Sequence, residues 1–291
     1  MTETQLTAVG PDAIKDSIHR LKGISCAFST VRKCIGALGN PEVSGRDIEL
    51  LLASDQGLAS RILKLANSAY FGISGRVSTI AMAVGVVGHR RLRLMLERIL
   101  VADMLSLLDT AGESGRFLRE FGVLAASVSH DLSVESWVGD PEEMLTVGLL
   151  HNVGDLASAS LFPREYQNVE RQAREMTRVE AEKAVFGVDC GTVGRWLLDG
   201  WSFPPIYGAA SRYWRTPLAH DGGNHLSQRL CVVHAAVRIA RALAEGRSPE
   251  DAFTSVDPTV TKELELRPEM VESLYEKVPE RIQQVRRITT A

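Results

Sequence analysis

The residues from Asp140 to Leu156 constrain the fold of this chain more than any other stretch. Asp140 followed by Pro141 is typical of a helix N-cap and first helical position. The apolar residues that follow lie on nearly every side of the expected helix, so this helix is predicted to be buried. A polar pair, His151 and Asn152, then precedes Gly154, which can end a helix. A buried histidine with a polar neighbour is a candidate metal-binding position.

Length and composition are those of an ordinary soluble protein. The 291 residues suffice for one large domain or two packed lobes, and 45% hydrophobic with 24% charged residues is typical of globular chains. The formal net charge of −3 gives no overall attraction to nucleic acid or anionic membranes. The four cysteines are widely spaced, which argues against a zinc ribbon or a dithiol redox site.

The N-terminus is polar and lacks the apolar core of a signal peptide. No apolar run approaches the length that a bilayer requires. The expected location is therefore the cytoplasm, without membrane attachment. Helix-period patterns recur along the chain and predict an all-α fold.

A second informative stretch begins with Asp55 and Leu58, continues as a helix, and ends in Asn67-Ser68 before an aromatic loop that holds Tyr70. Asn67 and Ser68 stand where the helix must stop. Their side chains can bond the backbone groups that the helix end frees, so a turn-locking role is favoured over ligand binding.

Both stretches resemble one known family. Leu149 to Gly154 is similar to the Leu-Leu-His-Asp-Ile-Gly segment of the HD superfamily, and the stretch from Asp55 to Gly72 resembles the hallmark of its HDOD branch. The resemblance covers roughly residues 24–243. It implies two helical lobes around an HD-like helical bundle, with residues 1–108 as the first lobe, 113–246 as the second and 247–291 as a helical extension. HDOD domains generally serve as signalling or regulatory modules.

The resemblance also locates a degenerate metal site. Asn152 stands where active relatives carry the aspartate, and a neutral amide cannot supply a bridging carboxylate or act as a base. Glu120 occupies the position of the first metal-ligating histidine, and Asp155 is the nearest replacement carboxylate. The remaining positions of the site are Cys190, where the family often has histidine, and Tyr213 with Trp214, near its His-His pair. We expect no metal, no cofactor and no catalysis, with His151 as a hydrogen-bonded core residue.

Two features leave alternatives open. The aromatic pair Tyr213-Trp214 is expected to fill the mouth of the old pocket, although it could stack on the base of a ligand. The basic run with Arg90, Arg91 and Arg93 is expected to be a solvated helix face paired with Glu97, since no aromatic residues interleave it. Contact with an anion, a partner or nucleic acid is the alternative for this run.

The leading hypothesis is a non-catalytic HDOD regulatory protein of a bacterial signalling pathway, which binds a protein partner or a small signalling ligand. The first alternative is a metal-dependent HD-type phosphohydrolase of nucleotides or cyclic dinucleotides, using Glu120, His151 and Asp155. The second alternative is a nucleic-acid-binding regulator that uses the basic run.

Overall fold

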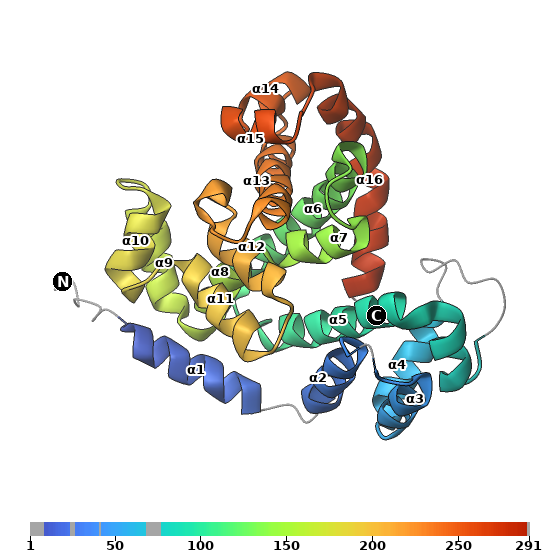
Figure 1. Cartoon of the computed structure of the whole chain (residues 1–291). Coiled ribbons are helices and arrows are strands. Elements are labelled where there is room, and N and C mark those ends of the chain that lie inside the picture. Colours follow the sequence, from blue (N-terminus) through green and yellow to red (C-terminus); the bar gives the residue numbers. More distant parts are fainter. Residues whose placement is uncertain (1–8, 24–26, 41, 68–76, 290–291) are drawn as a thin grey trace. The chain divides into compact units, whose positions relative to one another are not determined.

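The computed structural model describes residues 9–23, 27–40, 42–67 and 77–289. In this part of the chain helices are the only regular secondary structure, as the all-α prediction requires (Figure 1). The chain divides into two compact units, Lys22–Ser106 with Arg287–Ala291, and Met1–Leu21 with Leu107–Arg286. This division places the segment up to Leu21, which the sequence-based lobes assign to the first lobe, with the later residues.

The smaller unit is a group of helices: α2 (Ala27–Leu38), α3 (Gly45–Ala53), α4 (Gln56–Ala66) and α5 (Ile80–Leu107). Local sequence signals explain two of their starts. Ser44 and Asp47 form the capping box that the sequence predicts at α3, and the Asp55 side chain accepts a hydrogen bond from the Leu58 amide at α4. The α5 backbone is kinked at Gly88, where φ is 75°.

The larger unit contains the helices on which the candidate site lies. They are α1 (Pro11–Gly23), α6 (Gly112–Ser136), α7 (Pro141–Leu150), α8 (Val153–Leu161), α9 (Pro163–Gln172), α10 (Arg178–Phe186), α11 (Cys190–Gly200), α12 (Pro205–Tyr213), the 3-10 turn η1 (Pro217–Ala219), α13 (Asn224–Ala244), α14 (Pro249–Thr254), α15 (Pro258–Glu263) and α16 (Pro268–Thr289). Helices α6, α7 and α13 pack against one another (Figure 1).

Helix α7 is the buried helix that the sequence predicts. Asp140 caps it by accepting hydrogen bonds from the amides of Glu142 and Glu143, with Pro141 at the first position. Every residue from Met144 to Leu150 is buried. The chain then passes through His151 and Asn152 and enters α8, so the polar pair lies at a junction between two buried helices.

Glycines allow two pairs of these helices to approach closely, α8 with α11 and α7 with α6. A methyl group at Gly154 in α8 would overlap the Cys190 carbonyl oxygen and crowd the Gly194 amide, both in α11. A methyl group at Gly148 in α7 would likewise overlap Ser129 in α6. The Gly154 contact brings the start of α8 against the start of α11, and this approach positions Asp155 and Cys190 near each other.

The segment before α6 and the last helix, α16, each carry a prediction from the sequence. The segment Asp109 to Gly115 is predicted to be a hinge, but α6 begins at Gly112 and Gly115 is buried. The second half of this segment is therefore helical, and Gly115 is used for packing near Leu156. Helix α16 docks on α6, as its apolar stripe predicts, with Lys277 bound to Glu135 at 2.6 Å.

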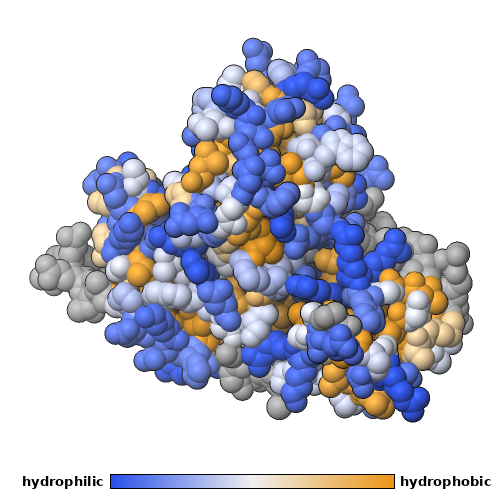
Figure 2. All heavy atoms as spheres, viewed as in Figure 1, coloured by the Kyte–Doolittle hydropathy of each residue, from blue (hydrophilic) through white to orange (hydrophobic). Residues whose placement is uncertain are grey.

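The visible surface carries residues of both polarities (Figure 2). Figure 2 shows hydrophilic residues over much of the visible face, with hydrophobic residues between them. Among the helices that the structure describes, none combines the length and the apolar character that crossing a bilayer would require.

The glycine contact between α8 and α11 gives a direct test of this packing. Replacing Gly154 with alanine places a methyl group on the Cys190 carbonyl, and such overpacking should lower the free energy of unfolding by about 3 kcal/mol. Gly200→Ala, also in α11, is the matched control because its added methyl meets nothing within 4 Å. Urea denaturation measures both variants, and equal stabilities would contradict the close approach.

Candidate functional site

His151 lies at the end of α7 as a core residue, only 1% exposed. Its Nδ1 is 2.7 Å from the Gly148 carbonyl oxygen, which can only accept, so Nδ1 carries the proton. The rings of Phe121 and Trp214 meet the imidazole edge-on, with centroids at 5.7 and 5.4 Å. The residue is thus the hydrogen-bonded core histidine that the sequence predicts.

The charge of His151 follows from this environment. Burial lowers the pKa of His151 to about 4, although the Gly148 hydrogen bond and the charge of Asp155 act in the opposite direction. The imidazole is therefore neutral near pH 7. A neutral histidine can serve as a metal ligand, so the rest of the donor set decides what this position can do.

The Asn152 side chain links the junction between α7 and α8 to α6 by a hydrogen bond. Its Nδ2 donates to the Leu118 carbonyl of α6 at 2.8 Å. Gly122 lies beside it, where an added methyl group would come within 3.5 Å of the Asn152 Oδ1. The amide replaces a carboxylate in the family pattern, and here it acts as a hydrogen-bond donor, which a carboxylate cannot do.

One turn beyond, two buried carboxylates meet two arginines. Asp155 Oδ1 accepts hydrogen bonds from Arg178 Nη2 and from the Tyr166 hydroxyl, each at 3.1 Å. Glu182 Oε1 accepts from Arg178 Nε at 3.1 Å and from Arg215 Nη2 at 3.3 Å. Arg215 Nη2 also lies 3.7 Å from Asp155 Oδ2. We call these four charged residues, with Tyr166, the ion-pair network.

The network pairs two acidic with two basic side chains, and its carboxylates are buried while Arg178 is 31% and Arg215 25% exposed. The Glu182 side chain is fully buried and that of Asp155 is 10% exposed. Burial and the charge of Asp155 raise the pKa of Glu182, while Arg215 and Arg178 lower it. Burial alone would lower the pKa of Arg178, but Asp155 and its other anionic neighbours hold it above the usual value. The two guanidiniums thus supply two positive charges beside the two carboxylates.

Cys190 borders the network without sharing its charge. Its backbone amide donates to Glu182 Oε2 at 2.8 Å, and its Sγ lies 3.6 Å from the Ser158 hydroxyl oxygen. Burial, with the charges of Asp155 and Glu182, raises the pKa of the thiol well above its ordinary value. Because the thiolate is the nucleophile and the metal ligand, this protonated thiol is inert.

These donors do not fit a hydrolytic metal centre. Within the described residues, one group of three metal-ligating side chains comes together, Asp155, Glu182 and Cys190, whose donor atoms lie within 4.8 Å of one another. His151 is not part of it. An ion there would have to displace two guanidiniums from the carboxylates and deprotonate a buried thiol, at a cost that the Asp155 and Glu182 ligands alone do not offset.

The aromatic pair separates in the structure. Trp214 packs against His151, and the Arg215 guanidinium lies over its indole at 4.6 Å, so Trp214 joins His151 to the ion-pair network. Tyr213 contacts His220 instead, with ring centroids at 4.9 Å. Of the two residues predicted to fill the pocket mouth, only Trp214 therefore lies against His151.

Glu120 does not lie with the buried residues around His151. It is exposed on α6, whereas its neighbour Phe121 is the residue that contacts His151. His130, ten positions further along the chain, belongs to another cluster, in which its Nδ1 is 2.8 Å from Asp131 Oδ1 and Arg281 of α16 binds the same carboxylate at 3.0 Å.

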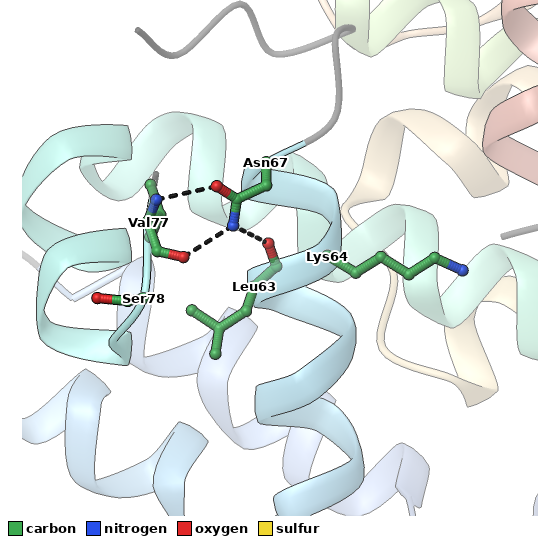
Figure 3. Close-up of a pocket in the computed structure, with 5 residues that line it drawn as sticks. All are labelled: Leu63, Lys64, Asn67, Val77 and Ser78. Atoms are coloured by element: carbon green, nitrogen blue, oxygen red, sulfur yellow. Dashed lines mark hydrogen bonds between the residues drawn. The ribbon is translucent and has the colours of Figure 1, made fainter. Parts of the chain in front are cut away.

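In the smaller unit, Asn67 locks a turn. Its Nδ2 donates to the carbonyls of Leu63 and Val77, each at 2.8 Å, and its Oδ1 accepts from the Val77 amide at 2.9 Å (Figure 3). Lys64 and Ser78 complete the lining of the adjacent depression of about 710 Å³. This is the turn-locking role that the sequence predicts. Ser68, its partner in the motif, lies outside the described residues.

The basic run lies on α5. Arg93 Nε is 2.9 Å from Glu97 Oε1, the pairing that the sequence predicts, and the Glu97 side chain is only 3% exposed. Arg90 and Arg91 are exposed on the same helix. Arg93 is therefore held by a buried carboxylate four residues away.

The sequence does not reveal the network arginines. Arg178 stands four residues before Glu182 on α10, and this spacing indicates an ion pair on a helix. It is the one local sequence pattern that points to a network arginine. Arg215 directly follows Trp214 and is joined to Glu182 and Asp155 only by tertiary folding. Tyr166 likewise reaches Asp155 from α9.

Removing one arginine of the network should lower the free energy of unfolding, because a buried carboxylate then loses its counter-charge. Arg215→Met leaves Asp155 and Glu182 with a single guanidinium, and the free energy of unfolding should fall by about 3 kcal/mol. Arg195→Met is the matched control, because Arg195 pairs with Asp199 where both side chains are about half exposed, and should change stability by less than about 1 kcal/mol. Similar losses in both variants would contradict a buried network.

The neutral His151 predicts an acid-sensitive stability. Because its folded pKa of about 4 lies below the ordinary 6.5, the unfolded chain binds more protons, and stability falls as pH decreases through this window. The contribution should reach about 3 kcal/mol. Unfolding free energies measured from pH 7 to 4 should show a smaller decline for His151→Gln than for the wild type, while the exposed His19→Gln keeps the wild-type slope. An unchanged slope in His151→Gln would refute a neutral buried imidazole.

Structural comparison finds the same fold in proteins of several bacteria. An HDOD domain protein of unknown function from Geobacter sulfurreducens aligns with a TM-score of 0.68 at 19% identity, covering 95% of this chain and 98% of that one. A candidate phosphohydrolase from Shewanella amazonensis SB2B gives 0.66 at 19% identity, covering 92% and 97%. A candidate signal transduction protein from Marinobacter aquaeolei VT8 gives 0.65 at 20% identity, covering 96% and 65%.

Sequence comparison adds a relative and a family. An uncharacterized protein of Treponema pallidum (strain Nichols) is 26% identical over 254 residues, which are 81% of this chain and 45% of that protein. The chain thus spans less than half the length of that relative. The model of the HDOD domain family matches residues 27–217, well over half of the chain. Together with the buried His151 junction and the Asn67 turn, this match shows that the chain belongs to the HDOD domain family.

Proposed function

We propose that the chain is a non-catalytic HDOD regulatory module that acts by binding a protein partner. The observation that carries this proposal is the ion-pair network. Asp155 and Glu182 are paired with Arg178 and Arg215, so the cationic charge that a catalytic metal would bring is already present at these carboxylates.

The phosphohydrolase alternative requires ligands that these residues do not offer. Hydrolysis at a metal centre needs an open coordination position and a group that activates water. Asn152 donates its amide hydrogen to Leu118, and Glu120 is exposed on α6 away from the contact that Phe121 makes with His151. The named structural neighbours include both a candidate phosphohydrolase and a candidate signal transduction protein, so fold similarity does not choose between the functions.

Metal content and turnover test the proposal together. The purified full chain is incubated with Mn²⁺, Fe²⁺ or Zn²⁺, freed of excess ion by gel filtration, and analysed by mass spectrometry for bound metal. The same samples are assayed with bis-p-nitrophenyl phosphate and with cyclic dinucleotides. We expect far less than one ion per chain and no turnover above the metal-only blank.

A variant sharpens this measurement. Asn152→Asp restores a carboxylate at the position beside His151, yet leaves Arg178 and Arg215 on Asp155 and Glu182, so it too should remain without bound metal and turnover. Stoichiometric metal with phosphodiester hydrolysis in the wild type would replace the regulatory proposal with the phosphohydrolase. Activity in Asn152→Asp alone would show that the amide, and not the network, abolishes catalysis.

A further inference from the structure

Trp137 is the most exposed large hydrophobic side chain in the described part of the chain, at 93%. It ends α6 in the left-handed conformation, with φ of 58° and ψ of 27°, where glycine is the usual residue. A tryptophan held in this conformation costs roughly 1 kcal/mol or more and gains nothing from burial. Stability of the fold therefore does not explain it.

The loop that carries Trp137 is preformed. The Ser133 hydroxyl donates to the Val138 carbonyl at 2.7 Å, and the next residue, Gly139, has a φ of 79° that only glycine adopts readily. A methyl group at Gly139 would lie 3.0 Å from Met144 in the buried part of α7. The indole is consequently presented by a fixed turn, which reduces the entropy that a binding partner would have to overcome.

A pocket of about 440 Å³ lies beside the indole, a size typical of binding pockets. It is formed where the end of α6, the start of α7 and the start of α13 meet. Its lining consists of Trp137, Val138, Gly139, Asp140, Glu143, His225, Gln228 and Arg229. We call it the Trp137 pocket.

The charges of the Trp137 pocket favour a cation. Two carboxylates, Asp140 and Glu143, stand against a single guanidinium, that of Arg229. Arg229 is paired with other residues of the pocket lining. Its Nη1 lies 3.0 Å from Glu143 Oε2, and its Nε donates to the His225 carbonyl at 3.3 Å. This arginine joins α13 to α7, and Asp140 Oδ1 accepts the Glu142 and Glu143 amides at the start of α7. The two carboxylates and the one guanidinium carry a formal net charge of −1.

We propose that the Trp137 pocket is the docking site for the protein partner, and that the partner inserts an arginine side chain that stacks on the Trp137 indole and pairs with the acidic wall. A planar guanidinium suits both contacts, since it stacks on aromatic faces and bonds carboxylates. The volume also admits residues on either side of the arginine. This inference rests on the proposed partner-binding function, to which it adds a surface and the chemistry of its ligand.

The chemistry of the pocket can be tested with a defined probe. N-acetyl-arginine amide is titrated into the ¹⁵N-labelled full chain, and the indole N–H signal of each tryptophan is followed by NMR. We expect the Trp137 signal to shift progressively and the signal of the buried Trp201 to stay, with the shift reduced by added salt. N-acetyl-glutamate amide is the matched probe, and a larger Trp137 shift with it would overturn the cationic assignment.

The docking role needs a second measurement. Partners are captured from a host lysate by the wild type, by Trp137→Ala and by Phe117→Ala, which removes another exposed aromatic residue of α6. The proposal expects a partner whose retention falls about tenfold or more in Trp137→Ala alone, as for an aromatic hot spot. Cross-linking should place an arginine of that partner at the pocket, and replacing this arginine with alanine should cause a similar loss.

Equal capture by the wild type and Trp137→Ala, or a partner that binds through Trp137 without an arginine, would overturn this docking site. Either result would leave the non-catalytic assignment standing, because metal content and turnover test that assignment separately. Circular dichroism and thermal unfolding confirm that Trp137→Ala is folded, which its exposure leads us to expect.

Discussion

Two carboxylates that are buried without an ion must find their counter-charges within the protein. In this chain Asp155 and Glu182 find them in Arg178 and Arg215, which reach the carboxylates from α10 and from the residues after α12. The arrangement joins four segments of the larger unit, since α8, α10, α11 and the residues after α12 all contribute to it. Removing either sign of charge would leave the other buried and uncompensated, which is costly in a protein interior.

The same constraint shapes the surroundings of His151. The Trp214 indole contacts both the imidazole and the Arg215 guanidinium, so it lies between these two groups. Gly148 fixes the tautomer and burial keeps the ring neutral. Asn152, which a hydrolase would need as a carboxylate, donates its amide hydrogen to Leu118 of α6. The residues around His151 thus serve packing and hydrogen bonding, which supports the proposed regulatory role.

The sequence predicts what depends on neighbouring residues and fails where distant segments meet. The caps of α3, α7 and α10, which use Ser44, Asp140 and Thr177, follow from local spacing and are all present. The turn at Asn67 and the burial of α7 are also local consequences of residue type. The contacts of Arg215 and Tyr166 with Asp155 join α8 to α9 and to the residues after α12, and they leave no local pattern. Only the family resemblance assigns Glu120 to the metal site. In the structure its neighbour Phe121, and not Glu120, contacts His151.

The central claim is that arginine, not a metal ion, neutralises the buried carboxylates. A crystal structure of the full chain grown with Mn²⁺, with anomalous diffraction measured for manganese, tests it most directly. The account expects no anomalous density at Asp155 and Glu182, with both guanidiniums still bonded to them. A manganese peak at about 2.2 Å from these carboxylate oxygens, with Arg178 or Arg215 turned away, would contradict it.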